Sequence, residues 1–171
     1  MNKNLIPDKM IPSFDRLDTR DLKKRNIDTI LLDIDNTLVG YKCVKPTPMV
    51  IKWIESLKDE GFKVGVVSNA TRNRTEIFCK DLGVVYVHRA AKPGGFGIRK
   101  ALSMLESGPE TTVFVGDQIF TDMFGANKLG CHSVLVKQIS KDESIYCRVK
   151  RIFEHRIHRK MQSETTADKT M

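Results

Sequence analysis

Short apolar runs alternate with segments of helical character along residues 27–136, and this alternation constrains the fold more than any other feature of the sequence. The run IDTILLDID (27–35) is apolar up to its acids, as in a strand buried on both faces. Four later runs have strand character, at 62–69, 84–88, 111–117 and 131–136. Helical segments separate the runs, and several end at a glycine: Gly61, Gly83 and Gly130. This order predicts an α/β fold with a doubly wound, Rossmann-like parallel sheet of about five strands and helices on both faces.

The length of 171 residues suits one such domain with additions at its ends. We expect an N-terminal docking segment at 1–27, a core at 28–136 and a basic amphipathic tail at 137–171. No run reaches the roughly 18 apolar residues of a membrane-spanning helix. The acids and broken apolar pattern of the first residues argue against a secretory signal and a transit peptide. The four cysteines are scattered, without a C-x-x-C pair, which favours a reducing cytoplasm over a disulfide framework or a zinc site.

Polar side chains follow the predicted strands at the points where ligands bind to open α/β sheets. In order along the chain they are Asp33, Asp35 and Thr37, then Ser68 and Asn69, then Lys92, then Asp117 and Asp122. Each alone has an ordinary explanation, such as a turn, a helix cap or a solvated lysine. Together they predict one site, because clustered carboxylates repel one another unless a cation lies between them. Oxygen donors without paired His or Cys select a hard ion, and Mg²⁺ fits best.

The four motifs DIDNT (33–37), SN (68–69), KP (92–93) and GDQIFTD (116–122) occur in this order. In this respect the sequence resembles the haloacid dehalogenase-like (HAD) phosphatase superfamily over about residues 28–136. The spellings DIDNTL and GDQxxTD, on a short chain, resemble its YqeG-type branch, which is similar to phosphatidylglycerophosphate phosphatases. The stretches from Thr37 to Ser68 and from Ser68 to Lys92 each leave room for one helix and one strand. We therefore expect no cap domain over the site.

The resemblance implies a role for each catalytic residue. Asp33 would be the nucleophile that takes the phosphoryl group as an aspartyl-phosphate. Asp35 would protonate the leaving oxygen and then activate water, and its backbone carbonyl would reach the metal. Lys92 would stabilise the nucleophile and the transferring group.

The resemblance also implies a metal set and a phosphate-binding set. The metal ligands would be Asp33, Asp35, Asp117 and Asp122, with Asp122 binding directly or through a water or a hydrogen bond. Thr37 would steady the loop that holds both acids. Ser68 and the backbone around Asn69 would hydrogen-bond the phosphoryl oxygens, and Lys92 would bind the same group.

The basic excess of the chain lies mostly in the predicted tail. Residues 137–160 hold eight Lys or Arg against three Asp or Glu, and the net charge of the whole chain is +8. Apolar residues recur at helical spacing between Ile145 and Met161, with basic residues in most other positions. This pattern fits either a helix lying on an anionic bilayer or a helix packed on the core or on another subunit.

The expected function is that of a Mg²⁺-dependent phosphatase whose substrate carries a phosphorylated group, best matched by a lipid head group. Phosphatidylglycerophosphate, dephosphorylated to phosphatidylglycerol, is the leading candidate. An open site also admits nucleic-acid ends or phosphoproteins, which are less favoured, and a non-catalytic assembly module on the same fold is a third alternative. We expect a cytoplasmic protein with peripheral contact at the inner face of the membrane.

Overall fold

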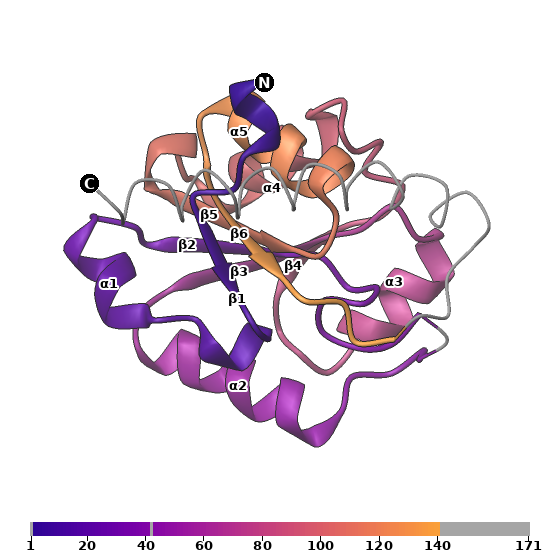
Figure 1. Cartoon of the computed structure of the whole chain (residues 1–171). Coiled ribbons are helices and arrows are strands. Elements are labelled where there is room, and N and C mark those ends of the chain that lie inside the picture. Colours follow the sequence, from indigo (N-terminus) through magenta and orange to yellow (C-terminus); the bar gives the residue numbers. More distant parts are fainter. Residues whose placement is uncertain (1, 42, 141–171) are drawn as a thin grey trace. The chain divides into compact units, whose positions relative to one another are not determined.

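The computed structural model describes residues 2–41 and 43–140, so the predicted tail from residue 141 onward lies outside the described part. Its centre is a sheet of six parallel strands in the order β1-β6-β5-β2-β3-β4 (Figure 1). The strands are β1 (Lys9–Ile11), β2 (Thr29–Leu32), β3 (Lys63–Val67), β4 (Val85–Val87), β5 (Thr112–Gly116) and β6 (His132–Val136). The predicted class, a doubly wound parallel α/β sheet, is confirmed. The strand count is six rather than about five.

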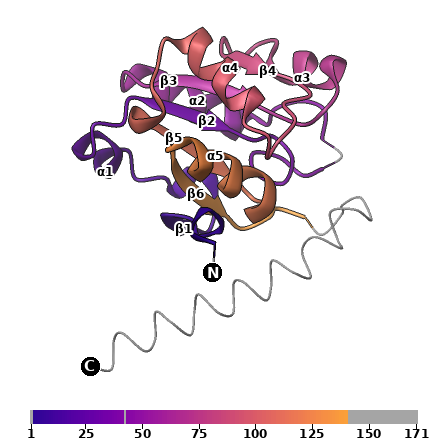
Figure 2. The same ribbon diagram turned by 90° about the horizontal axis from the view of Figure 1, so that it is seen from above.

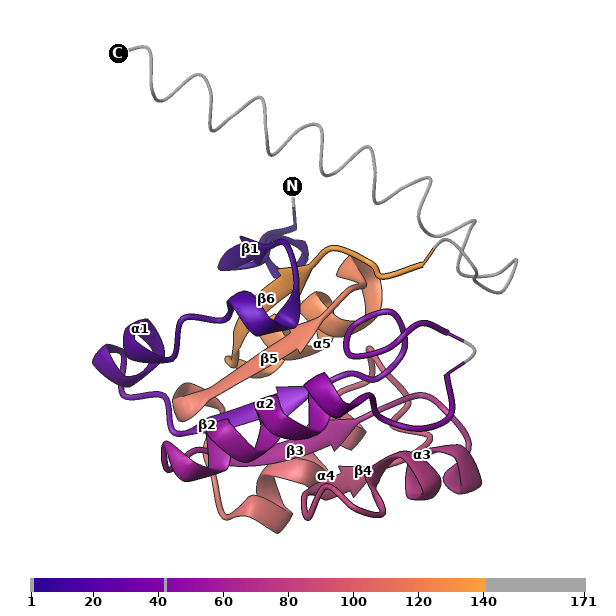
Figure 3. The ribbon, with the colours of Figure 1, turned by 90° about the horizontal axis from the view of Figure 1, so that it is seen from below.

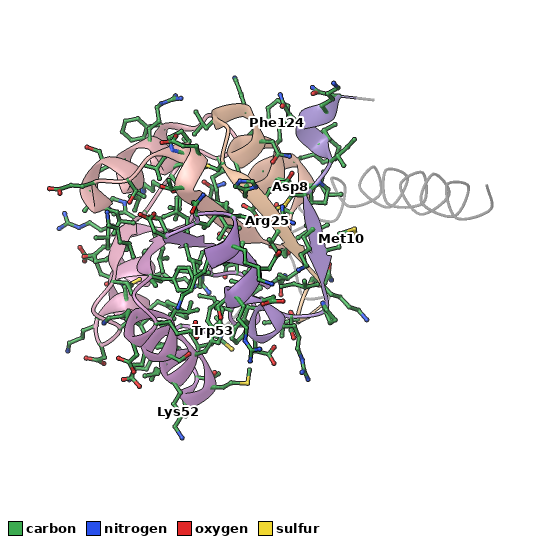
Figure 4. The ribbon with its side chains drawn as sticks, turned by 90° about the vertical axis from the view of Figure 1, so that its left-hand side faces the viewer. Asp8, Met10, Arg25, Lys52, Trp53 and Phe124 are labelled. Carbon is green, nitrogen blue, oxygen red and sulfur yellow. The ribbon has the colours of Figure 1, made fainter. Side chains whose placement is uncertain are left out.

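Helices cover both faces of this sheet. They are α1 (Thr19–Lys24), α2 (Pro48–Asp59), α3 (Arg72–Cys79), α4 (Phe96–Leu105) and α5 (Phe124–Leu129). From above, α4 and α5 lie in front of the sheet (Figure 2), and from below α2 lies in front of it (Figure 3). Figure 4 accordingly places Trp53 of α2 and Phe124 of α5 on opposite sides of the strands.

Two apolar layers hold the helices to the sheet, because alternate residues of a strand face opposite sides. On β2, Ile30 and Leu32 join the cluster that contains Ile54 of α2 and Phe78 of α3. Leu31, between them, faces the layer beneath α4. All four residues of β2 are buried, which explains why its sequence is a continuous apolar run.

The sixth strand, β1, comes from the predicted N-terminal docking segment. It pairs with β6, with Lys9 opposite Val134. The Asp8 amide donates to the Ser133 carbonyl at 3.0 Å, and the Ser133 amide donates to the Asp8 carboxylate at 2.8 Å. Asp8 and Met10 lie along this edge of the sheet in Figure 4. The boundaries proposed at residues 27 and 136 stay a prediction.

All strands run in the same direction, so their carboxyl ends meet at one end of the sheet, on the right in Figure 1. We call this the carboxyl end and the opposite one the amino end. In the described residues, one helix and one strand connect Thr37 to Ser68, and another such pair connects Ser68 to Lys92. Across the same residues, no helix combines the length and the apolar character needed to cross a bilayer. Of the described cysteines, Cys79 and Cys131 are buried, Cys43 is exposed, and all three are free thiols.

Candidate active site

The loop after β2 places Asp33 at the centre of the carboxyl end. The Asp33 amide continues the sheet by donating to the Val115 carbonyl at 3.0 Å. The chain then turns tightly, with Asn36 at φ 60°, and the amides of residues 37–39 all donate to the Ile34 carbonyl. This turn leaves Asp33 only 4% exposed, directly beyond β2.

Lys92 joins two of the predicted acids. Its Nζ lies 2.5 Å from Asp33 Oδ1 and 2.8 Å from Asp122 Oδ1. All three side chains are buried, and the Lys92 ammonium also lies 5.3 Å from the centre of the Phe114 ring. The structure therefore brings residues from three separate segments of the chain into direct contact.

Three carboxylates form a candidate metal site. Asp33, Asp117 and Asp122 each offer one oxygen, and these oxygens lie within 4.8 Å of one another. Thr37 Oγ1 donates to Asp117 Oδ1 at 3.4 Å, which links the loop after β2 to the end of β5. Three buried carboxylates and one lysine leave an excess of two negative charges. A divalent cation with oxygen ligands fits this donor set in both charge and chemistry.

Burial and mutual contact shift the pKa values of Asp33 and Lys92. Burial raises the pKa of the Asp33 carboxyl well above its usual range; Lys92 opposes this shift and Asp122 reinforces it. Burial alone would lower the pKa of Lys92, but the carboxylates of Asp122 and Asp33 outweigh it and raise that pKa. Lys92 is therefore a fixed positive charge within the cluster.

Gly116 is required for the position of Asp122. A Cβ atom at residue 116 would lie 2.4 Å from Asp122 Oδ2 and 2.6 Å from its Cγ. The Gln118 amide holds the same Oδ2 at 3.1 Å. The absence of a side chain at Gly116 thus allows Asp122 to fold back beneath the end of β5 through the π-helical turn η4 (Ile119–Met123).

Asp35 contacts an arginine that the sequence did not single out. Arg74, in the first turn of α3, donates from Nη1 to Asp35 Oδ2 at 2.7 Å. Arg74 Nη2 lies 2.6 Å from Asp35 Oδ1, so the two side chains also form an ion pair. The angles at these two atoms do not suit a second hydrogen bond. The same Nη2 donates to the carbonyls of Tyr41 and Cys43, at 3.1 and 2.8 Å. Arg74 therefore fixes Asp35 and the loop beyond it to α3.

Ser68 and Asn69 lie at the end of β3. The Ser68 side chain is buried, and its Oγ accepts from the Ala70 amide at 3.1 Å, a bond that does not use the hydroxyl proton. Asn69 Oδ1 accepts from the Lys92 amide at 3.0 Å, and its Nδ2 donates to the Lys92 carbonyl at 3.4 Å. The Asn69 side chain therefore holds the backbone of the lysine.

All the residues predicted for the site lie at the carboxyl end of the sheet. The direct contacts join Asp33, Lys92 and Asp122, and Thr37 joins Asp117. The individual roles assigned to these residues stay predictions. Sequence reasoning missed Gly116 and Arg74. For Gly116, the glycine of the GD pair was a signal in the sequence. For Arg74, the weak signal was its position shortly after the SN pair.

The comparisons with known proteins agree with this geometry. The sequence profile of a family described as haloacid dehalogenase-like hydrolase matches residues 3–136. The chain is 34% identical over 157 residues to Probable phosphatase YqeG of Bacillus subtilis, covering 92% of this chain and 91% of that protein. It is 27% identical over 111 residues to Glyceraldehyde 3-phosphate phosphatase of Pyrococcus furiosus, covering 60% of this chain and 45% of that protein.

Among solved structures, one similar fold is the cobalt-bound form of the deoxy-D-mannose-octulosonate 8-phosphate phosphatase from Haemophilus influenzae. The TM-score is 0.55 at 17% identity, over 67% of this chain and 70% of that one. An uncharacterised protein from Listeria monocytogenes matches with a TM-score of 0.56 at 18% identity, over 70% of this chain and 85% of that one. These likenesses bear on the fold.

Proposed function

Because this chain belongs to the haloacid dehalogenase-like hydrolase family, we propose that it is a divalent-metal-dependent phosphatase that uses Asp33 as its nucleophile. The observation that carries the proposal is the buried contact of Asp33 with Lys92, beside Asp117 and Asp122. The proposed reaction needs a carboxylate held in place, a fixed positive charge for the phosphoryl oxygens and a site for a cation. This cluster supplies all three within one buried region.

In the proposed first step, an oxygen of the Asp33 carboxylate attacks phosphorus, and the bond from phosphorus to the ester oxygen breaks. Asp35 gives its proton to the leaving oxygen, so the product leaves as an alcohol. In the second step, Asp35 takes a proton from water, whose oxygen attacks phosphorus and displaces the Asp33 carboxylate. The net reaction consumes one water and yields one alcohol and one phosphate.

The other side chains hold the phosphoryl group during both steps. Lys92 lies against Asp33, where its charge offsets the charge that gathers on the transferring oxygens. The Ser68 hydroxyl, at the neighbouring strand end, offers a donor to the same group. Asn69 keeps Lys92 in place through its backbone, which adds a positioning role to the phosphate-binding role that the resemblance implies.

For the cation we propose Mg²⁺, held by Asp33, Asp117 and Asp122, with the backbone carbonyl of Asp35 as a further ligand. The observed basis is the set of hard oxygen donors and its two excess negative charges. When bound, the ion would neutralise negative charge on the phosphoryl group and help to orient it. Asp117, which accepts a hydrogen bond from the Thr37 hydroxyl, offers one oxygen to this cluster.

For the substrate we propose phosphatidylglycerophosphate, with the protein in the cytoplasm and in peripheral contact with the inner face of the membrane. The support is the resemblance to the YqeG-type branch, the short connections that add no cap in the described residues, and the basic excess of the sequence. A site without a cap admits a phosphate carried on a large surface.

A side-by-side turnover assay tests this assignment. The substrates are vesicles carrying phosphatidylglycerophosphate, a 3′-phosphorylated oligonucleotide and a phosphopeptide, each with Mg²⁺ and with a chelator. We expect the lipid to be turned over fastest and the chelator to stop all turnover. Preference for either soluble substrate would contradict the lipid assignment and leave the phosphatase assignment intact. No phosphate release from any substrate, including an aryl phosphate, would favour an assembly module.

A further inference from the structure

Loops and helix starts follow the strands at the carboxyl end of the sheet, where the candidate site lies. We define the rim as the described residues 36–41, 43–49, 69–74, 88–96 and 137–140. Its segments follow β2, β3, β4 and β6 and therefore share the carboxyl end of the sheet (Figure 1). Backbone contacts join them: the Ile139 amide donates to the Asn36 carbonyl at 3.2 Å, and the Arg89 amide donates to the Ala70 carbonyl at 3.0 Å.

Large apolar side chains are exposed on this rim. The described residues contain nine large apolar side chains that are exposed, and five of them lie here: Tyr41, Val44, Met49, Phe96 and Ile139. Phe96 is 62% exposed and Ile139 is 51% exposed. A single exposed apolar residue is normal, but five on the loops and helix starts at one end of the sheet indicate an interaction surface.

The charges of the rim have one sign. The described rim residues include no Asp or Glu, whereas Lys45, Arg89 and Lys137 are exposed. Of the acids that follow β2 and β5, Asp33, Asp117 and Asp122 are buried, and Asp35 is partly exposed and paired with Arg74. The surface that a partner would meet is therefore cationic and apolar, and it surrounds a site that binds a phosphoryl group.

We propose that the rim docks on an anionic lipid bilayer, with its apolar side chains in the interfacial region and its cations among the head groups. Charge complementarity identifies an anionic partner, and the exposed aliphatic and aromatic side chains favour a bilayer over a nucleic acid, whose backbone offers no apolar layer to receive Val44 or Ile139. Docking in this way would turn the mouth of the site toward the head groups. This inference rests on the proposed function in one respect: the proposed lipid substrate would reach the site from the bilayer in this orientation.

The experiment measures binding of the full-length chain to vesicles of phosphatidylcholine, with and without phosphatidylglycerol. The apolar variant carries Val44→Ser, Phe96→Ser and Ile139→Ser. Its matched control carries Ile6→Ser, Met10→Ser and Met104→Ser, exposed apolar residues outside the rim. The charge variant carries Lys45→Gln, Arg89→Gln and Lys137→Gln, and its control carries Lys24→Gln, Lys100→Gln and Lys128→Gln, which removes the same charge from exposed positions elsewhere.

The wild type and both controls should bind the anionic vesicles with similar affinity. The charge variant should bind roughly 100-fold more weakly, since each cation at an anionic surface contributes about fivefold. The apolar variant should lose roughly tenfold or more, because its side chains no longer enter the interface. Both rim variants should keep aryl phosphate turnover, since the altered side chains lie outside the catalytic cluster.

Two results would overturn the proposal. One is that the rim variants bind anionic vesicles as well as their controls do. The other is that the rim variants lose affinity for a single-stranded oligonucleotide and keep it for vesicles, which would make the rim a nucleic-acid surface. A wild-type protein that shows the expected vesicle binding and no aryl phosphate turnover would contradict the proposed function and support the docking surface.

Discussion

The two ends of the sheet are built from the same strands but differ in how their charged side chains are paired and buried. At the amino end, polar groups find partners close by: Lys63 Nζ donates to the Glu106 carbonyl at 3.0 Å, and the hydroxyls of Thr29 and Ser107 lie 2.7 Å apart. Lys23 and Glu60, 3.5 Å apart, pair at the surface. Each of these interactions joins residues from two different segments at the amino end.

At the carboxyl end, three acids and a lysine are buried together with an excess of negative charge. Clustering carboxylates away from water costs stability unless a cation joins them. The contrast teaches that the buried charge at this end is explained by binding and chemistry rather than by folding. Five predictions test the contrast, in order of decreasing effect.

The largest effect is expected for Asp33→Asn. The amide keeps the shape of the side chain but is a poor nucleophile, so phosphate release from an aryl phosphate in Mg²⁺ should fall on the order of 10⁴-fold. Asp28→Asn, at the amino end, is the matched control and should keep wild-type turnover, because the Asp28 carboxylate accepts from the Thr29 hydroxyl, far from the catalytic cluster. Substantial turnover by Asp33→Asn would remove the basis of the contrast.

Gly116→Ala should reduce kcat roughly 100-fold, because displacing a reacting or metal-binding group by about 1 Å costs that much. The new methyl group would collide with the Asp122 carboxylate. Gly40→Ala is the control: apart from its chain neighbours, the nearest atom to its Cβ would be the Ser140 hydroxyl oxygen at 3.7 Å, an ordinary contact. Equal turnover by both variants would mean that the position of Asp122 is unimportant.

Mg²⁺ should raise the melting temperature of the wild-type protein, because it binds the folded site and not the unfolded chain. At about 100 times its dissociation constant the ion adds about 2.7 kcal/mol, which corresponds to roughly 5–10 °C in a protein of this size. Asp117→Asn should abolish most of the shift. A shift that survives this substitution would place the ion elsewhere.

Arg74→Ala should lower kcat about tenfold with a smaller change in KM, since Asp35 and the loop carrying Tyr41 lose their common anchor. Steady-state kinetics on an aryl phosphate measure both constants. Arg72→Ala is the control, because Arg72 forms an exposed pair with Glu76 in the same helix, a kind of pair that contributes little to stability. The conservative variant Arg74→Lys should keep part of the kcat that Arg74→Ala loses.

The smallest effect is expected at the amino end. Thr29→Val removes the buried hydroxyl that contacts Ser107 and should cost about 1 kcal/mol of unfolding free energy, measured by urea titration. Turnover should not change. A loss of turnover larger than the loss of stability would show that the two ends are coupled.

The sequence predicted the main sheet and the place of the site because both depend on local signals. Buried parallel strands have continuous apolar sequences, and polar residues that follow such strands must meet at one end. Strand β1 was missed because it has three residues, Lys9 to Ile11, too few to show a period, between Pro7 and Pro12. Its place in the sheet depends on pairing with β6, more than 100 residues away.

Within the site, the missed residues act through long-range geometry. Arg74 is one of two arginines near the start of α3, and only the folded chain shows that it reaches Asp35, 39 positions earlier. The need for Gly116 is steric and appears only when Asp122 folds back over it. The backbone around Asn69 was expected to bind the phosphoryl oxygens together with Ser68. The hydrogen bonds between the Asn69 side chain and the Lys92 backbone are visible only in the structure.

The central claim is that Asp33 accepts the phosphoryl group beside a divalent cation held by acids from separate strand ends. A crystal structure with Mn²⁺ and beryllofluoride, an analogue of a phosphoryl group on a carboxylate, tests it most directly. We predict beryllofluoride on Asp33 and an anomalous Mn²⁺ peak in contact with Asp33 and Asp117. Beryllofluoride on another side chain, or a Mn²⁺ peak away from these carboxylates, would contradict the account.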